Sequence, residues 1–308
     1  MLRPLALLAA LAFAAACSSV PTAGAPTPGP SLQTQLEALT SPFHGKAGIY
    51  VRHLGTGEEA AIAADDTFPT ASMIKVPILG ALLAKVDRGE LDYHQELTYT
   101  KNRLYAGEDL LGAFAEGERV VLAKVAMLMI TTSDNTAALW CQELAGTGTA
   151  INEWLAAQGM KTTRVNSRTP GREAARTEHG WGQTSPREMA ELVVQMRKGT
   201  FGTPAASEEA LRCLSRIYWD AEALSVIPPW VHTASKQGAV NRSRSEVVLV
   251  SAPGGDYVFC VITKDQSDES WGRDNEGYVL LRQVSALLWR HFAPEVPYTP
   301  DLGMRKFW

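Results

Sequence analysis

The sequence predicts an α+β fold: an antiparallel β-sheet flanked by helices, with an all-helical lobe inserted between its strands. Two observations lead to this prediction. Strand-like apolar runs stand near both ends of the chain, at 47–54 and 59–64 and again at 246–251 and 257–263. The long stretch between them carries the 3.6-residue apolar period of helices instead. A sheet whose strands come from both ends of a chain, with helices packed on it, is an α+β arrangement.

Local patterns place the individual elements in order along the chain. A short helix is expected at 31–39, before the first two strands, which the turn Gly55-Thr56-Gly57 joins. Pro253-Gly254-Gly255-Asp256 predicts a tight turn between the last two strands, and a long helix is expected at 275–292. The helical lobe is expected at about 72–218, with helices at 72–88, 122–130, 135–144, 151–158, 186–197 and 207–218.

The composition fits one domain of two lobes and argues against some classes of function. The chain has 308 residues, of which 45% are hydrophobic and 20% charged, enough to bury a sizeable core. Its formal charge of −4 argues against a nucleic-acid partner. The six histidines follow no metal-ligand spacing such as His-Glu-x-x-His, so we expect neither a metal nor another cofactor. We also expect a monomer.

The N-terminus is typical of an exported protein. Arg3 precedes an apolar run that is too short to span a bilayer, so residues 1–16 are predicted to be a signal peptide. Ala14-Ala15-Ala16-Cys17 resembles a bacterial lipoprotein box, in which Cys17 would be lipidated; the alternative is ordinary cleavage within the alanines. Residues 17–30 then form a Pro/Gly-rich tether before a catalytic domain at 31–308. We expect a periplasmic protein held at a membrane only by this lipid.

Ser72 and Lys75 are the first candidate catalytic pair. They stand three residues apart at the start of an apolar run, so they lie on one helix face one turn apart. Serine is a weak nucleophile until a base takes its proton, and a buried lysine can be that base because burial disfavours its charged form. Chance can also produce this spacing on a solvated helix face. A lysine inside an apolar helix is costly without a function, which favours catalysis.

Ser133-Asp134-Asn135 is the second candidate motif, and it precedes a helical pattern. All three residue types cap helices, which is the structural alternative to a catalytic role. The two roles are compatible. A serine at a helix start can relay a proton to a leaving nitrogen, and the Asn135 amide can bind a peptide-like substrate.

Lys236-Gln237-Gly238 is the third motif and lies on the predicted strand before residue 246. Lys236 supplies a second positive charge, which would lower the pKa of Lys75. Gly238 would let a substrate backbone approach the strand closely. The alternative is an ordinary strand with a surface lysine. The three motifs in this order are typical of serine acyl-transfer enzymes that use lysine to move protons.

These motifs resemble the three boxes of class A β-lactamases and of the wider penicillin-recognising serine hydrolases, including D-Ala-D-Ala peptidases. The resemblance runs from about residue 31 to residue 290 and implies a β-lactamase/transpeptidase-like fold. It implies that Ser72 is acylated, that Lys75 is its base and that Ser133 relays the proton. It further implies a substrate site that includes Asn135, Lys236, Gly238, Ala239 and Arg244. In this site Lys236 attracts the substrate carboxylate, and the backbone N–H groups of Ser72 and Ala239 form an oxyanion hole.

The chain departs from the family pattern at two places. Gln237 stands where the third box usually carries a hydroxyl residue, so recognition of the substrate carboxylate is expected to differ. The glutamate that serves as the deacylation base of class A enzymes is missing, and its place falls at about Thr169. Glu173 and Glu178 lie nearby at other spacings and are expected to be loop surface charges. Acylation is therefore expected, and deacylation is expected to be slow.

The sequence thus predicts a serine hydrolase that opens the β-lactam amide through a Ser72 acyl-enzyme, an activity that breaks down β-lactam antibiotics and gives resistance. One alternative is a D-Ala-D-Ala peptidase-like penicillin-binding protein with slow deacylation, whose substrate is a peptidoglycan peptide. Another, of a different class, is a non-catalytic envelope binding module. The module would form no covalent adduct with a β-lactam.

Overall fold

A computed structural model of the protein describes residues 30–105, 107 and 109–301. The predicted signal peptide, Cys17 and nearly all of the tether lie outside these residues. From Ser31 onward the described chain belongs to one compact unit. None of the helices within the described ranges is both long enough and apolar enough to cross a membrane.

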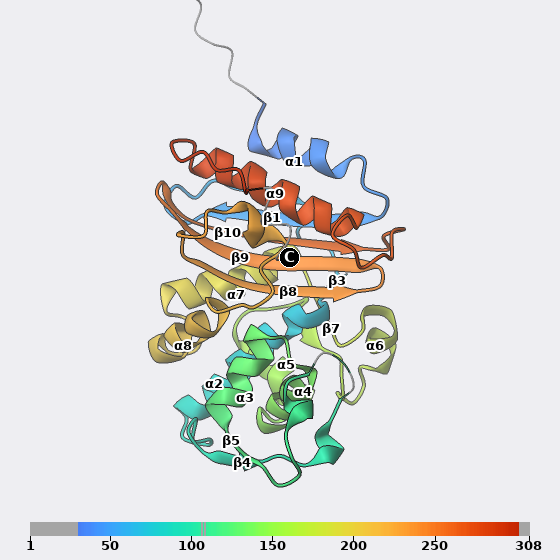
Figure 1. Cartoon of the computed structure of the whole chain (residues 1–308), viewed down its shortest axis with the longest axis vertical. Helices are drawn as coiled ribbons and strands as arrows, with labels where there is room; N and C mark the ends of the chain where they lie inside the picture. The colour runs from blue at the N-terminus through green and yellow to red at the C-terminus, as the bar shows by residue number, and fades with distance from the viewer. Residues whose placement is uncertain (1–29, 106, 108, 302–308) are drawn as a thin grey trace, which may run out of the picture. The chain divides into compact units, whose positions relative to one another are not determined.

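The unit is built on a five-stranded antiparallel sheet with the order β2-β1-β10-β9-β8 (Figure 1). Its strands come from both ends of the chain, as the sequence predicted: β1 (Lys46–His53), β2 (Glu59–Ile62), β8 (Thr233–Val240), β9 (Ser243–Ala252) and β10 (Gly255–Lys264). Two adjacent inner strands, β9 and β10, are buried along almost their whole length. Burial on both faces explains why these strands read as nearly continuous apolar runs.

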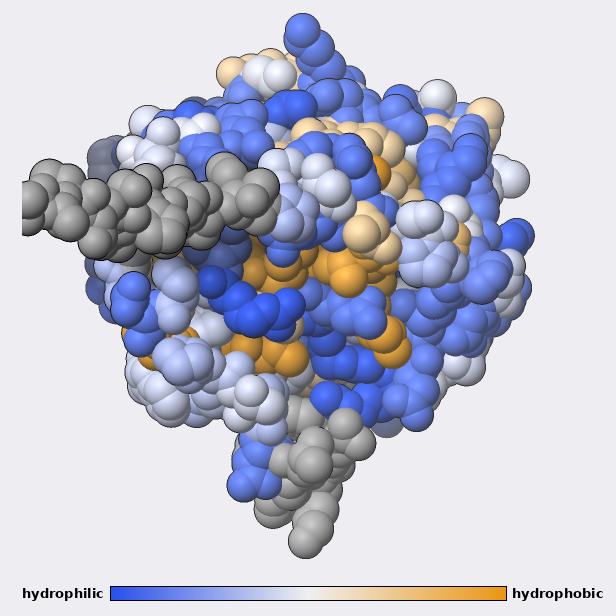
Figure 2. Space-filling view, turned by 90° about the horizontal axis from the view of Figure 1, so that it is seen from above, coloured by the Kyte–Doolittle hydropathy of each residue, from blue (hydrophilic) through white to orange (hydrophobic). Residues whose placement is uncertain are grey.

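Helices cover both faces of the sheet. On one face α1 (Leu32–Thr40) and α9 (Glu276–Phe292) pack over a core that includes Val248, Phe259 and Leu288. The outer surface of this layer is largely hydrophilic, with hydrophobic residues in separate patches (Figure 2). On the other face α7 (Pro186–Lys198) packs on the sheet, and the helical lobe lies beyond it (Figure 1).

The lobe between β2 and β8 is mainly helical. Its α-helices are α2 (Lys75–Asp87), α3 (Leu122–Thr131), α4 (Asn135–Leu144), α5 (Thr147–Ala157), α6 (Glu173–His179), α7 and α8 (Pro204–Leu214). Short 3-10 turns are η1 (Ala71–Ile74), η2 (Lys101–Arg103), η3 (Leu111–Ala113) and η4 (Ala223–Val226). Small strands pair within it: β3 (Phe68–Pro69), β7 (Gly182–Thr184) and β6 (Arg164–Val165) in one sheet, and β4 (Glu96–Thr98) with β5 (Arg119–Val121) in another.

Several lobe elements differ from the prediction, among them the short strands β3 to β7, the 3-10 turn η1 and the helices α8 and α6. Helix α8 spans Pro204–Leu214, whereas a helix at 207–218 was predicted. It begins earlier because Thr203 caps its start by accepting from Ala206 N, with proline in the first turn. Helix α6 occupies a stretch that was expected to be loop. It has no fully buried residue, so it carries no apolar stripe by which the sequence could reveal it.

Candidate active site

The candidate nucleophile Ser72 lies on the 3-10 turn η1, which leads directly into α2. Ala71 before it has φ +44°, in the left-handed region that non-glycine residues avoid, so the surrounding packing must hold it there. In a 3-10 turn residues i and i+3 eclipse each other. Lys75 Nζ accordingly lies 3.2 Å from Ser72 Oγ.

Lys75 is fully buried among oxygen atoms. Its Nζ lies 3.0 Å from Ser133 Oγ, 2.5 Å from the Ser133 carbonyl oxygen and 2.8 Å from Asn135 Oδ1. Burial lowers the pKa of Lys75 to about 7, while the Asp134 and Asp109 carboxyl groups act to raise it. A large fraction of Lys75 is therefore neutral at neutral pH and able to accept a proton.

Ser133 lies between the two lysines. Its hydroxyl oxygen is 3.0 Å from Lys75 Nζ and 3.1 Å from Lys236 Nζ. Ser133, like Ala71, is a non-glycine residue in the left-handed region, with φ +60°. Asp134 caps α4 by accepting from Ala137 N at 2.7 Å. The capping role thus falls to Asp134, and the Ser133 hydroxyl is left to contact the lysines.

Lys236 reaches the same hydroxyl from strand β8 and is also fully buried. It donates to Gln237 Oε1 at 2.7 Å and to the Gln237 carbonyl oxygen at 3.0 Å. Burial and the nearby Lys75 lower the pKa of Lys236. Two ammonium groups that share one hydroxyl disfavour each other's charge, so the pair favours a neutral base.

Gly238 holds β8 close to the nucleophile. A β-carbon at Gly238 would stand 2.7 Å from the Thr70 carbonyl oxygen and 2.8 Å from the Ser72 backbone nitrogen. The glycine is therefore required for packing of the strand on η1. It also lines the cleft, and its predicted role in the approach of a substrate backbone stays a prediction. Ala239, the next residue, lines the cleft beside Ser72.

Arg244 does not reach the cleft, which corrects the expectation that it binds substrate. It is fully buried on the face of the sheet that α9 covers, where its Nη2 donates to the Ser270 carbonyl oxygen at 2.6 Å. Its guanidinium lies 4.5 Å from the centre of the Trp271 ring and 4.7 Å from that of Tyr278. Side chains alternate between the faces of a strand, so the neighbouring Ser245 lines the cleft instead.

Among the residues that the structure describes, no glutamate stands at the position of the family's deacylation base, which holds Thr169. Thr169 packs against Gly148 of α5 and donates to the Ser167 carbonyl oxygen at 3.0 Å, and it does not line the cleft. Glu173 is exposed at the start of α6. Glu178 lies on α6, exposed at the edge of the cleft, with its carboxylate 3.5 Å from His179 Nε2.

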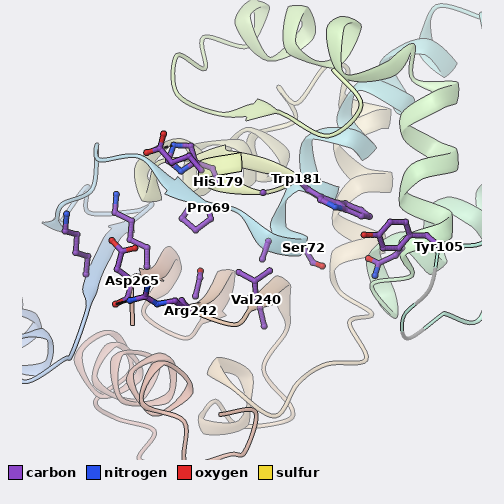
Figure 3. Close-up of a pocket in the computed structure, with 16 residues that line it drawn as sticks. Pro69, Ser72, Tyr105, His179, Trp181, Val240, Arg242 and Asp265 are labelled. Atoms are coloured by element: carbon purple, nitrogen blue, oxygen red, sulfur yellow. Dashed lines mark hydrogen bonds and ion pairs between the residues drawn. The ribbon is translucent and has the colours of Figure 1, made fainter. Parts of the chain in front are cut away.

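The cleft has two branches that meet at Ser72, Asn135 and Ala239. The first, about 670 Å³, passes between β8 and the α6–β7 segment. In Figure 3, Tyr105 and Trp181 lie to one side of Ser72 in this branch, and His179, Arg242 and Asp265 lie to the other. Tyr105 meets Trp181 edge to face at 5.0 Å.

The second branch, about 700 Å³, is lined by Ser133, Gln237, Trp219, Trp271 and others. Sequence reasoning missed the aromatic residues of both branches, because single aromatics in loops follow no motif. Within the described ranges no group of three or more histidine, cysteine, aspartate or glutamate side chains is placed to hold a metal ion.

Comparison with known proteins connects this geometry to one family. The family model described as "Beta-lactamase enzyme family" matches residues 31–292. A β-lactamase of Streptomyces fradiae is 33% identical over 185 residues, which cover 58% of this chain and 59% of that protein. β-Lactamase AER-1 of Aeromonas hydrophila is 28% identical over 150 residues, covering 47% and 49%. The matched region thus spans only about half to three-fifths of these relatives.

Solved structures match over more of the chain. PBP-A is 26% identical with a TM-score of 0.76, covering 86% of this chain and 96% of that one. A mutant of PBP-A, solved as an acyl-enzyme complex with penicillin G, is 26% identical with a TM-score of 0.75, covering 86% and 97%. An ancestral class A β-lactamase has a TM-score of 0.74 at 24% identity, covering 85% and 100%, which shows likeness of fold.

Proposed function

This chain belongs to the β-lactamase enzyme family, and we propose that it is a serine hydrolase that opens β-lactam amides through an acyl-enzyme on Ser72. One observation carries the proposal. Lys75, fully buried and with a pKa lowered to about 7, lies within hydrogen-bond distance of both Ser72 Oγ and Ser133 Oγ. A neutral amine between two hydroxyl groups can take a proton from one and return it through the other.

Acylation follows from these contacts. Neutral Lys75 takes the proton of Ser72 as Oγ attacks the lactam carbonyl carbon, and the developing oxyanion is stabilised by the backbone N–H groups of Ser72 and Ala239. The C–N bond then breaks, and the Ser133 hydroxyl donates its proton to the leaving nitrogen. Lys75 returns the proton it took to Ser133. Lys236 attracts the substrate carboxylate, whose charge would raise the pKa of Lys236 again.

Hydrolysis of the acyl-enzyme is the slow half of the reaction in this proposal. A water must be deprotonated near the acyl carbon, and the family's glutamate position holds Thr169, which is buried against Gly148. The alternative function, a D-Ala-D-Ala peptidase-like penicillin-binding protein, would use the same chemistry but form a very long-lived acyl-enzyme. The time course of the adduct separates the two functions.

Intact-mass spectrometry after incubation with benzylpenicillin tests the proposal. We expect the mass of the protein to rise by one penicillin equivalent and to return to its starting value over minutes to hours. Ser72→Ala should form no adduct, because it removes the attacking hydroxyl, and the Ser133 hydroxyl, which also contacts Lys75, serves as the proton relay in this proposal. An adduct that persists in Ser72→Ala would refute the nucleophile, and no adduct in the wild type would favour the non-catalytic binding module.

We further propose a bacterial periplasmic location, with attachment to a membrane through a lipid on Cys17 and a monomeric state. The support is the sequence alone: an export signal, the small residues before Cys17 and the tether that follows. In the periplasm the enzyme would meet a β-lactam before the drug reaches its targets, which is how it would confer resistance. Labelling with a radioactive fatty acid should mark the wild type and spare Cys17→Ser.

A further inference from the structure

The two branches of the cleft must hold opposite ends of the substrate. This step rests on the proposed function, in which Ser133 protonates the leaving nitrogen. Ser133 lines the second branch, and the lining of the first branch does not include it. The leaving nitrogen and everything attached to it therefore lie in the second branch. The acyl side chain lies in the first, along Val240 and against the paired rings of Tyr105 and Trp181.

Two tryptophans form the wall of the leaving-group branch. Trp219 is held by its indole N–H, which donates to the Thr132 carbonyl oxygen at 2.9 Å, directly beside Ser133. The Tyr218 ring meets it edge to face at 5.1 Å. Trp219 remains 37% exposed and Trp271 59% exposed, so both rings present surface to the cleft although they are large and apolar.

Trp271 is fixed from behind by Arg244. The guanidinium of this buried residue is stacked between the Trp271 and Tyr278 rings, at 4.5 and 4.7 Å from their centres. Its N–H groups donate to the backbone carbonyl oxygens of Ser270 and Ser243, at 2.6 and 2.9 Å. A delocalised cation between two rings is a favourable arrangement. Arg244 thus orients Trp271 as a positioning residue and leaves the other face of the ring to the solvent.

We propose that Trp219 and Trp271 form a subsite for leaving groups that carry a planar aromatic or heteroaromatic ring. Such a ring can stack on either indole, whereas a D-alanine leaving group is too small to contact both in a branch of about 700 Å³. The subsite therefore favours bicyclic β-lactams with large substituents on the ring fused to the lactam. It also explains how this site binds a leaving group without Arg244 in the cleft.

Two cephalosporins that share a 7-thienylacetamido group and differ at carbon 3 test the subsite. One carries a dinitrostyryl group there and the other a methyl group. The measurement is the ratio of their second-order acylation rate constants, followed by stopped-flow spectroscopy and intact mass on the full chain. Comparing this ratio between variants cancels the different intrinsic reactivity of the two compounds. We expect Trp271→Ala and Trp219→Ala each to lower the ratio about tenfold, the order of one lost aromatic pair.

Two control variants accompany the comparison of the two cephalosporins. Trp271→Phe should keep most of the wild-type ratio, because a ring remains on Arg244. Tyr105→Ala removes an aromatic from the acyl branch, so it should slow both compounds equally and leave the ratio unchanged. Circular dichroism of the two alanine variants reports correct folding, and the ratio is unaffected by any loss of rate that both compounds share. An adduct on Ser72 with an unchanged ratio in both alanine variants would overturn this inference alone. No adduct in the wild type would overturn the proposed function with it.

Discussion

At the scale of single residues, the proposed reaction gives the two lysines different tasks although both contact the hydroxyl of Ser133. Lys75 must give up its proton to act as base, whereas Lys236 needs its charge to attract a carboxylate. We expect Lys75→Arg to reduce acylation by about 10³, because guanidinium stays protonated. Lys236→Arg keeps the charge and should mainly weaken substrate binding, by about tenfold. Stopped-flow acylation over a range of substrate concentrations separates the two effects; equal and small effects would contradict these roles.

The lowered pKa of Lys75 also predicts a pH dependence. Burial brings the pKa to about 7, from about 10.4 for a free lysine. The neutral form is the base, so its fraction rises as the pH increases through 7 and then levels. We therefore expect the acylation rate constant to increase between pH 5 and pH 7 and to change little above pH 8. A rate constant that is flat over this range, or that falls as pH rises, would show that Lys75 is not the base.

At the scale of elements, the contact between β8 and η1 sets the geometry of the nucleophile. A methyl group at Gly238 would meet the Ser72 backbone nitrogen at 2.8 Å and must push strand and turn apart. We expect Gly238→Ala to lower the acylation rate constant by about 10², the effect of misplacing a reacting group by about an ångström. Gly272→Ala is the control, because a β-carbon there meets no atom within 4 Å. Circular dichroism would confirm folding, and normal acylation of folded Gly238→Ala would contradict the prediction.

Elements with strong local signals could be read from the sequence. Helix α4 begins at Asn135 and ends at Leu144 as predicted, because a capping residue precedes a clear apolar period. Helix α6 could not be predicted, since nothing in its seven residues is fully buried. The 3-10 turn before α2 was also missed, because its sequence continues the apolar pattern of the α-helix.

At the scale of the whole molecule, the sequence located the motifs but not every side chain. Ser72, Lys75, Ser133 and Lys236 meet as the family pattern implies, although they come from distant parts of the chain. Arg244 lies close to Lys236 in the sequence and yet faces α9. A strand alternates its faces residue by residue, so one position decides between cleft and core, and motif spacing does not fix that choice.

The two lobes together also decide the fate of the acyl-enzyme. In the proposed reaction the helical lobe supplies Lys75 and Ser133 for acylation. The segment between β6 and β7 carries Thr169, which does not line the cleft, at the sequence position of the family's glutamate, and places Glu178 at the edge of the cleft beside His179. We expect a burst of one product equivalent with a chromogenic cephalosporin. The steady-state rate that follows should be lower than the rate of the burst by a factor of 10³ or more. Each tenfold corresponds to about 1.4 kcal/mol, so this factor requires only about 4 kcal/mol of lost transition-state stabilisation.

Stopped-flow hydrolysis measures both phases of this reaction in one experiment. The size of the burst should match the concentration of enzyme, and the slow phase should equal the rate at which the adduct mass disappears. If turnover instead exceeded about 10² per second without a burst, a base would have to exist in the cleft. Alanine at Glu178 or Glu222, the glutamates that line the cleft among the described residues, would then identify it, because losing the base restores the burst while Lys75 still supports acylation.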